Sequence, residues 1–149
     1  MNARDIDTVI QILYESISGP AGQEPRWDQV RPLFFPGARM MKITRGADGL
    51  PRTEDRAVEA YIELTAEILR SNGFYEWEIA RRTDRFGSVA QLFSTYEARH
   101  DRADPEPFKR GINSIQLFHD GERWWIINMI WEDEAADRPL PAEYLPAPG

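Results

Sequence analysis

The sequence predicts a single α+β domain in which two amphipathic helices cover a sheet of long strands. Apolar residues recur at helical spacing in two separate stretches, 6–17 and 58–69. After the second stretch the period changes to two, and residues 111–134 form the clearest hairpin pattern of the chain, closed by the dipeptide Asp120-Gly121. A chain of 149 residues can bury most of its apolar surface without disulfides or metals, so one core is expected.

Composition limits the partners and the compartment. The net charge of -7 disfavours nucleic acid, because binding to a phosphate backbone needs a basic face. The absence of cysteine excludes disulfides, thiolate metal sites and a cysteine nucleophile, and it fits a reducing compartment. Neither the N-terminus nor any later segment has the apolar run of a signal peptide or a membrane span. We therefore expect a cytoplasmic protein with no membrane partner and no nucleic-acid partner.

The first predicted helix spans residues 6–17. Its apolar stripe consists of Ile6, Val9, Ile10, Leu13, Tyr14 and Ile17, and Ser18-Gly19-Pro20 ends it. Tyr14 lies inside the stripe, so its ring should be buried and its hydroxyl should need a partner. One interpretation is a core tyrosine that reaches the rim or a backbone carbonyl; the other is a hydroxyl that orients a ligand.

A short helix and a hairpin should follow. Residues 27–31 predict about one helical turn, broken at Pro32. Residues 38–44 predict a strand, and Ala47-Asp48-Gly49 predicts a turn whose return strand is cut short by Pro51.

The second long helix repeats the apolar stripe of the first. Thr53 or Asp55 should be its N-cap, and Ser71-Asn72-Gly73 should end it. The stripe consists of Val58, Tyr61, Ile62, Thr65, Ile68 and Leu69.

Two strands, 74–86 and 89–100, should come next. Their less charged faces carry Tyr75, Trp77 and Ile79 on the first strand and Leu92, Ser94, Tyr96 and Ala98 on the second. The opposite faces carry Glu76, Glu78 and Arg82 on the first strand and Glu97 and Arg99 on the second. This pattern predicts a cross-strand charge ladder that faces solvent or a second subunit.

The central hairpin carries most of the aromatic surface. With a two-residue turn at Asp120-Gly121, Gln116 is opposite Trp125 and Ser114 is opposite Ile127. We therefore assign a face with Ser114, Gln116, Trp125 and Trp131 to the interior of the domain. A slip of one residue would exchange the faces and bring Asn113 inside. The domain should span 1–134, and the proline-rich tail 135–149 should be extended or partly disordered.

Three motifs carry a family resemblance. They are Ile10-Gln11-Ile12-Leu13-Tyr14, the segment 27–38 (WDQVRPLFFPGA) and the segment 120–127 (DGERWWII). Together with the order of elements, they resemble the SnoaL-like family of the nuclear transport factor 2-like superfamily, over nearly the whole chain up to about Glu134. The resemblance implies a cystatin-like α+β roll, in which a cone-shaped, curved mixed sheet wraps around the N-terminal and central helices. These motifs are specific for the fold and say little about chemistry.

The resemblance also implies a pocket, open at the wide end of the cone. Binding of a small hydrophobic or aromatic molecule there is the function that we predict first. The expected wall or orienting residues are Tyr14, Trp27, Tyr61, Tyr96, Ser114, Gln116, Trp125 and Trp131. No metal or cofactor is expected, because nucleotide motifs are absent and the two histidines, His100 and His119, lack the spacing of a zinc site.

A cofactor-independent isomerase, dehydratase or polyketide-cyclase-type enzyme is the alternative. The isomerases need a carboxylate base, and the strand that would carry it has no carboxylate between Asp28 and Asp48. The remaining candidates for proton transfer are Glu78, whose pKa an apolar surround would raise, and His100, with Tyr14 stabilising negative charge. Arginines close by in the sequence make charge pairing the simpler expectation for Glu78.

A third interpretation is a dimeric interaction module whose pocket is filled by its own side chains. In every case we expect a homodimer that covers the outer face of the sheet.

Overall fold

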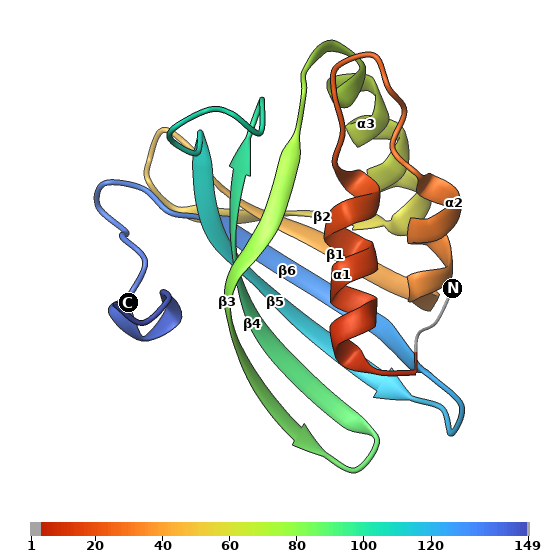
Figure 1. Cartoon of the computed structure of the whole chain (residues 1–149). Coiled ribbons are helices and arrows are strands. Elements are labelled where there is room, and N and C mark those ends of the chain that lie inside the picture. Colours follow the sequence, from red (N-terminus) through yellow and green to blue (C-terminus); the bar gives the residue numbers. More distant parts are fainter. Residues whose placement is uncertain (1–3, 149) are drawn as a thin grey trace.

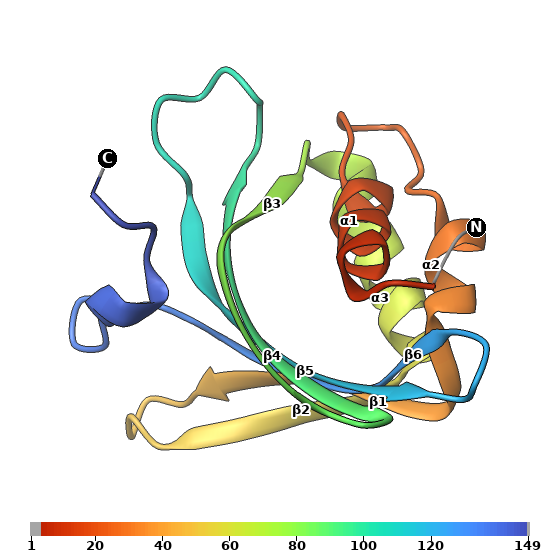
Figure 2. The same ribbon diagram turned by 60° about the horizontal axis from the view of Figure 1, so that its bottom comes forward.

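The computed structural model describes residues 4–148 and contains one strongly curved sheet with both long helices on its concave side (Figure 1, Figure 2). The sheet has six strands in the order β2-β1-β6-β5-β4-β3, and only β1 and β6 pair in parallel. The elements are α1 (Ile6–Ile17), α2 (Trp27–Val30), η1 (Arg31–Leu33), β1 (Phe34–Arg45), β2 (Pro51–Ala57), α3 (Val58–Ser71), β3 (Tyr75–Phe86), β4 (Val89–Arg99), β5 (Lys109–His119), β6 (Trp124–Asp133) and η2 (Ala142–Tyr144). The predicted α+β architecture with a curved mixed sheet is confirmed. Residues 1–3 and 149, at the ends of the predicted domain and tail, lie outside the described part.

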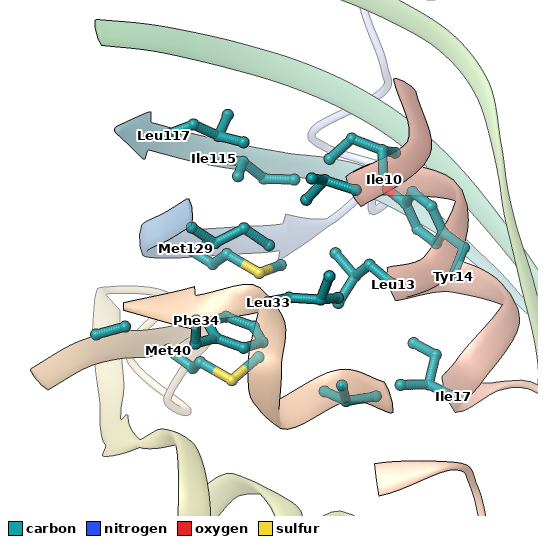
Figure 3. Packing of buried hydrophobic residues seen from close by; sticks show 14 of the residues in the cluster. Ile10, Leu13, Tyr14, Ile17, Leu33, Phe34, Met40, Ile115, Leu117 and Met129 are labelled. Atoms are coloured by element: carbon teal, nitrogen blue, oxygen red, sulfur yellow. The ribbon is translucent and has the colours of Figure 1, made fainter. Parts of the chain in front are cut away.

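Helix α1 forms where the apolar stripe predicts it. The Asp5 carboxylate accepts a hydrogen bond from the backbone N–H of Thr8 at 2.7 Å, which satisfies one free donor of the first turn. Its apolar face packs on side chains from β1, β5 and β6, and Figure 3 shows the contributors Ile10, Leu13, Tyr14, Met40, Ile115, Leu117 and Met129. Each fully buried aliphatic side chain of this kind stabilises the fold by roughly 1.5–3 kcal/mol.

The first hairpin is longer than the sequence predicts. Strand β1 begins at Phe34 rather than Ala38. Strand β2 begins at Pro51, the residue that we expected to cut the return strand short. Pro51 is tolerated because it is the first residue of an edge strand.

Helix α3 starts directly from β2. Its N-cap position is Ala57, and no side chain caps it. The prediction of Thr53 or Asp55 as the cap is wrong, because pairing with β1 keeps both residues inside the strand.

Two charged residues of β3, Glu76 and Glu78, face the concave side instead of forming an outer ladder, whereas Arg82 lies opposite Phe93 on the convex side. Glu76 pairs with Ala98 and Glu78 pairs with Tyr96, so both carboxylates share a face with buried residues of β4. The predicted charge ladder is therefore wrong, since Glu97 lies opposite Trp77 on the other face.

Aromatic rings take the convex face of β3 because polar partners cover them there. The indole Nε1 of Trp77 donates to a Glu97 carboxylate oxygen at 3.0 Å, and the Arg99 guanidinium lies 4.9 Å from the indole centroid. A ring with a hydrogen bond and a stacked cation is stable on a partly solvated face.

The turn of the β5–β6 hairpin is longer than two residues. His119 and Trp124 form the last strand pair, which leaves residues 120–123 in the loop. The Asp120 carboxylate accepts from the backbone N–H groups of Glu122 at 2.8 Å and Arg123 at 3.0 Å. The two-residue register that we predicted is therefore wrong.

A bulge in β6 then changes the side to which its residues point. Gln116 pairs with Asn128 and Leu117 pairs with Ile126, so Ile127 is an extra residue without a partner. The alternation inferred for this strand breaks at that point. Trp124 and Ile126 lie in the core before the bulge, and Met129 lies in the core after it.

The C-terminal segment lies against the convex face (Figure 2). The Thr95 hydroxyl donates to the Tyr144 carbonyl oxygen at 2.6 Å, and the Phe93 and Tyr144 rings are 5.3 Å apart. The tail thus covers part of the face that we assigned to a second subunit.

Candidate functional site

The helices and the concave face enclose an inner cavity of about 60 Å³. Its polar wall consists of Glu76 from β3, Tyr96 from β4, Lys109 and Asn113 from β5, and Tyr61 from α3. The remaining lining is apolar: Leu13, Ile17, Val30, Met40, Phe74, Met129 and Trp131. This volume holds a few water molecules or the narrow end of a ligand.

A larger outer chamber of about 370 Å³ adjoins the inner cavity. The two spaces share Ile17, Tyr61, Phe74, Lys109 and Trp131 as lining residues. The chamber opens to solvent, because three large apolar side chains of its lining, Leu64, Ile68 and Phe108, are exposed. Together the two spaces form a site with a wide outer part, lined by aromatic and aliphatic side chains and by charged groups such as Lys42 and Lys109, and a narrower polar inner end.

Glu76 is the principal ionisable group of the inner end. Burial raises the pKa of its carboxyl to about 7; the positive charge of Lys109 opposes this rise, and the negative charge of Asp133 adds to it. Within residues 4–148, the carboxylate forms no ion pair and its oxygens accept no hydrogen bond. A carboxyl group that is half-ionised near neutral pH and has no protein partner is available to a ligand.

Tyr96 reaches across a glycine to a second carboxylate. Its ring crosses β5 at Gly111, and its hydroxyl donates to the Asp133 carboxylate of β6. A methyl group at Gly111 would lie 2.3 Å from that hydroxyl oxygen, so only glycine leaves room. Burial raises the pKa of Tyr96, and Asp133 raises it further. Tyr96 is therefore a neutral wall residue whose proton is already engaged.

Tyr14 belongs to a hydrogen-bonded relay behind the cavity wall. The Ser94 hydroxyl donates to Glu78 Oε2 at 2.5 Å and therefore must accept from Tyr14, 2.7 Å away. The Tyr14 oxygen in turn accepts from Asn113 Nδ2 at 2.9 Å. Both hydrogen-bonding directions of Tyr14 are used inside the protein, and burial raises the pKa of its hydroxyl.

The three predicted catalytic residues do not meet at one point of the cavity. Glu78 pairs with an arginine, as expected, but the partner is Arg81 at 2.9 Å and not Arg82 or Arg99; it connects to Tyr14 through Ser94. His100 lies at the outer chamber, where Nδ1 is 3.0 Å from the Gly73 carbonyl oxygen. Its ring is stacked on Phe108 with centroids 3.9 Å apart.

Apart from Tyr14, which lies behind the cavity wall, the predicted ligand-binding residues fall into three groups. Tyr61, Tyr96 and Trp131 line the inner cavity, and the Tyr61 and Trp131 rings meet edge to face at 5.7 Å. Trp27 is a core residue outside the cavity, with its indole Nε1 buried and without a hydrogen-bond partner among residues 4–148.

Ser114, Gln116 and Trp125 make up the third group, on the convex face. Ser114 lines an outer groove with Phe93 and Ile130, and Gln116 is exposed. Trp125 packs against Phe35 at 5.7 Å and donates to Asp120. Assigning these three residues to the pocket is wrong: they share one face, as predicted, but that face is the convex one. The bulge at Ile127 separates Trp131 from them and places it at the cavity.

Sequence reasoning missed Glu76 and Lys109 and held Asn113 only as the result of a slipped register. The available signal was the alternation of Glu76 with Tyr75 and Trp77, but it does not show which face is inside. Within the described part of the chain, no three histidine, aspartate or glutamate side chains are grouped to hold a metal ion. Among residues 4–148, no helix has the length and hydrophobicity to cross a membrane.

Comparisons with known proteins support the fold. No protein-family model and no curated protein match this chain. A protein of unknown function with a cystatin-like fold from Nostoc punctiforme is similar at TM-score 0.65 and 10% identity, over 88% of this chain and 90% of that chain. An NTF2-like protein of unknown function from Shewanella baltica is similar at TM-score 0.57 and 12% identity, over 87% and 94%. Another, from Methylobacillus flagellatus, is similar at TM-score 0.56 and 14% identity, over 91% and 96%.

Identities this low establish the fold and not the activity. The sheet order, the helices on the concave side and these neighbours agree: the chain has the nuclear transport factor 2-like, cystatin-like α+β fold.

Proposed function

We propose that this protein binds a small, mainly apolar molecule in the site formed by the outer chamber and the inner cavity. The observation that carries the proposal is the pair of adjoining hollows, an outer chamber with an aromatic wall and an inner cavity with a polar end. We further propose, from the three sequence motifs, that it is a cytoplasmic member of the SnoaL-like family.

The size of the hollow supports an aromatic or similarly compact ligand. Pockets that enclose small molecules typically measure about 300–1,000 Å³, and the outer chamber of about 370 Å³ lies in this range. Aromatic rings line its wall, with Tyr61 and Trp131 in edge-to-face contact and Phe74 beside them. The ligand body would pack on these rings, and its narrow polar end would enter the inner cavity.

A variant that fills the chamber tests this proposal. Thr65 lies on α3, is half-buried and lines the chamber, whereas Glu63 is exposed on another face of the same helix. Thr65→Trp should abolish binding of naphthylethanol in calorimetry, and Glu63→Trp should leave it intact. Native mass spectrometry of the purified protein should detect a retained small molecule in the wild type and in Glu63→Trp only. Equal binding by the two variants would reject the chamber as the binding site.

Acid–base catalysis is a second candidate, favoured by one specific observation. Glu76 has a pKa of about 7 and faces the cavity, which suits a general base at neutral pH. An isomerase, dehydratase or cyclase would use Glu76, since Glu78 is already paired with Arg81. In deuterium oxide, the wild type should accelerate exchange of the acidic C–H protons of tetralone, and Glu76→Gln should not. Identical exchange rates would remove this candidate.

The third interpretation, an interaction module with a filled pocket, has less support. Its own side chains leave the outer chamber open, and no segment among residues 4–148 plugs it.

A further inference from the structure

The only two lysines of the chain, Lys42 and Lys109, both line the outer chamber. They come from different strands, β1 and β5, which are separated in the sheet by β6. The other 16 basic residues are arginines, from 18 lysines and arginines in total minus these two. The outer chamber is thus the hollow that both lysine side chains share, and Lys109 also borders the inner cavity and an outer groove.

Arginine and lysine have different tasks in this protein. Every ion pair among the described residues uses an arginine. Within residues 4–148, neither lysine forms an ion pair; Lys109 Nζ instead lies 5.5 Å and 5.9 Å from the ring centroids of Phe74 and Phe108. Both ammonium groups therefore remain available for an external anion.

The other charges at the chamber do not cancel these two. Glu54 lies opposite Lys42 across the strand pair, but it forms its ion pair with Arg56 at 3.1 Å. Lys109 also borders an outer groove with Glu97, Glu106 and Glu134, of which Glu97 and Glu134 pair with Arg99 and Arg110. Glu76 lies at the inner end and lines only the inner cavity, and with a pKa of about 7 it carries a partial negative charge at neutral pH, which offsets less than one of the two lysines. The entrance of the site is thus locally positive in a protein with a net charge of -7.

We propose that the site takes an amphipathic anion: an aromatic or similarly apolar carboxylate whose head group lies between Lys42 and Lys109 and whose body packs on Tyr61 and Trp131. This inference rests on the proposed function and names the ligand class. A lysine ammonium is a compact charge with freely rotating donors, which suits a head group that arrives from solvent. The inner end, with the Glu76 carboxyl, favours a hydrogen-bond donor on the ligand over a second anionic group.

The charges of the two lysines set how strongly the site should prefer an anionic ligand over a neutral one. A pair of opposite charges at a partly solvated site changes affinity by up to about fivefold. Two lysines acting on one carboxylate should together give about tenfold or more, and salt should weaken the preference because the entrance is open to solvent.

Three probes that share one aromatic body separate the possibilities: naphthylacetate, naphthylethanol and naphthylethylamine, measured by calorimetry on the full chain. Naphthylacetate should bind about tenfold more tightly than naphthylethanol at low salt, with naphthylethylamine weakest. Lys42→Met and Lys109→Met should each weaken naphthylacetate about three- to fivefold and leave naphthylethanol unchanged. Arg82→Met removes the same charge from the convex side and should change neither affinity.

The outcomes distinguish the two proposals. If no probe binds, the proposed function fails and this inference fails with it. If naphthylethanol binds and naphthylacetate gains nothing, or if naphthylethylamine binds best, the pocket stands and the anionic class is rejected. If Lys109→Met does not fold, Lys42→Met and the salt dependence of the wild type still test the anionic ligand class. A preference for naphthylacetate that does not change with salt would contradict that class.

Discussion

Replacement of Glu76 by glutamine should stabilise the protein above neutral pH and have little effect in acid. Glutamine imitates the protonated carboxyl in shape and cannot ionise. The change therefore removes only the cost of keeping a charge in the inner cavity. This cost appears in the free energy of unfolding, because burial in the cavity wall disfavours the charged carboxylate.

The magnitude follows from the pKa of Glu76, which burial raises from 4.5 to about 7. Below pH 4.5 the carboxyl is protonated in both the folded and the unfolded states, so its full contribution to stability is present. Between these values the unfolded chain ionises first, and wild-type stability falls as pH rises through the folded pKa. At about 1.4 kcal/mol per pH unit, the loss reaches about 3 kcal/mol above pH 7.

Urea unfolding of the wild type and Glu76→Gln at a series of pH values measures this difference directly. The curves should converge near pH 4 and separate to about 3 kcal/mol near pH 8, with glutamine the more stable. Glu63→Gln, on the exposed face of α3, should follow the wild type throughout. A difference that stays constant from acid to base would show that water or a partner compensates the Glu76 charge, and the argument for an available carboxyl would fail.

Three further perturbations test packing, the relay and assembly. Gly111→Ala should cost about 1–3 kcal/mol in urea unfolding, because its methyl group would lie 2.3 Å from the Tyr96 hydroxyl oxygen and 2.4 Å from the Glu132 carbonyl oxygen. An undiminished stability of Gly111→Ala would contradict this packing. Ser94→Ala should lower the free energy of unfolding by about 1–3 kcal/mol, since it leaves the Tyr14 hydroxyl without its acceptor. The double variant Ser94→Ala/Tyr14→Phe should lose less stability than the sum of the two single variants, whereas strict additivity would mean that the hydroxyls act independently. The homodimer through the sheet stays a prediction: sedimentation equilibrium should show dimers, and Phe118→Lys on the partly exposed convex face should give folded monomers, while a monomeric wild type would reject it.

The local spacing of apolar residues was sufficient to predict the helices that bury one continuous apolar stripe. The spacing of apolar residues placed α1 at Ile6–Ile17, since a helix of that period has only one face to bury. It also located α3, although the start of that helix depended on how far β2 continued beside β1. The α+β class followed from the order of these periods along the chain.

The sequence pattern alone could not predict which face of each strand points into the domain. A strand that carries large side chains on both faces does not indicate which face is inside. In β3, Trp77 looked like a core residue and Glu76 like a surface residue, and pairing with β4 reversed both assignments. In β6, the bulge at Ile127 moved Trp125 to the convex side and kept Trp131 on the concave side.

The cavity residues also include some that the sequence predicted and some that only strand pairing revealed. Tyr61, Tyr96 and Trp131 were predicted at the cavity and lie there, because two independent facts agree for each: an aromatic type and a position on a buried stripe or strand. Whether they contact a ligand stays a prediction. Glu76 and Lys109 were not predicted, since nothing in their immediate neighbours distinguishes them from surface charges.

The sequence by itself determined which segments become helices and strands, in what order, and with how much apolar surface to cover. These properties depend on residues within a few positions of one another. Only the tertiary structure decided that a carboxyl from β3 and an ammonium from β5 share one hollow beneath α3. Their meeting depends on the register of pairs between strands distant in the chain, where one extra residue changes the side to which every following side chain points.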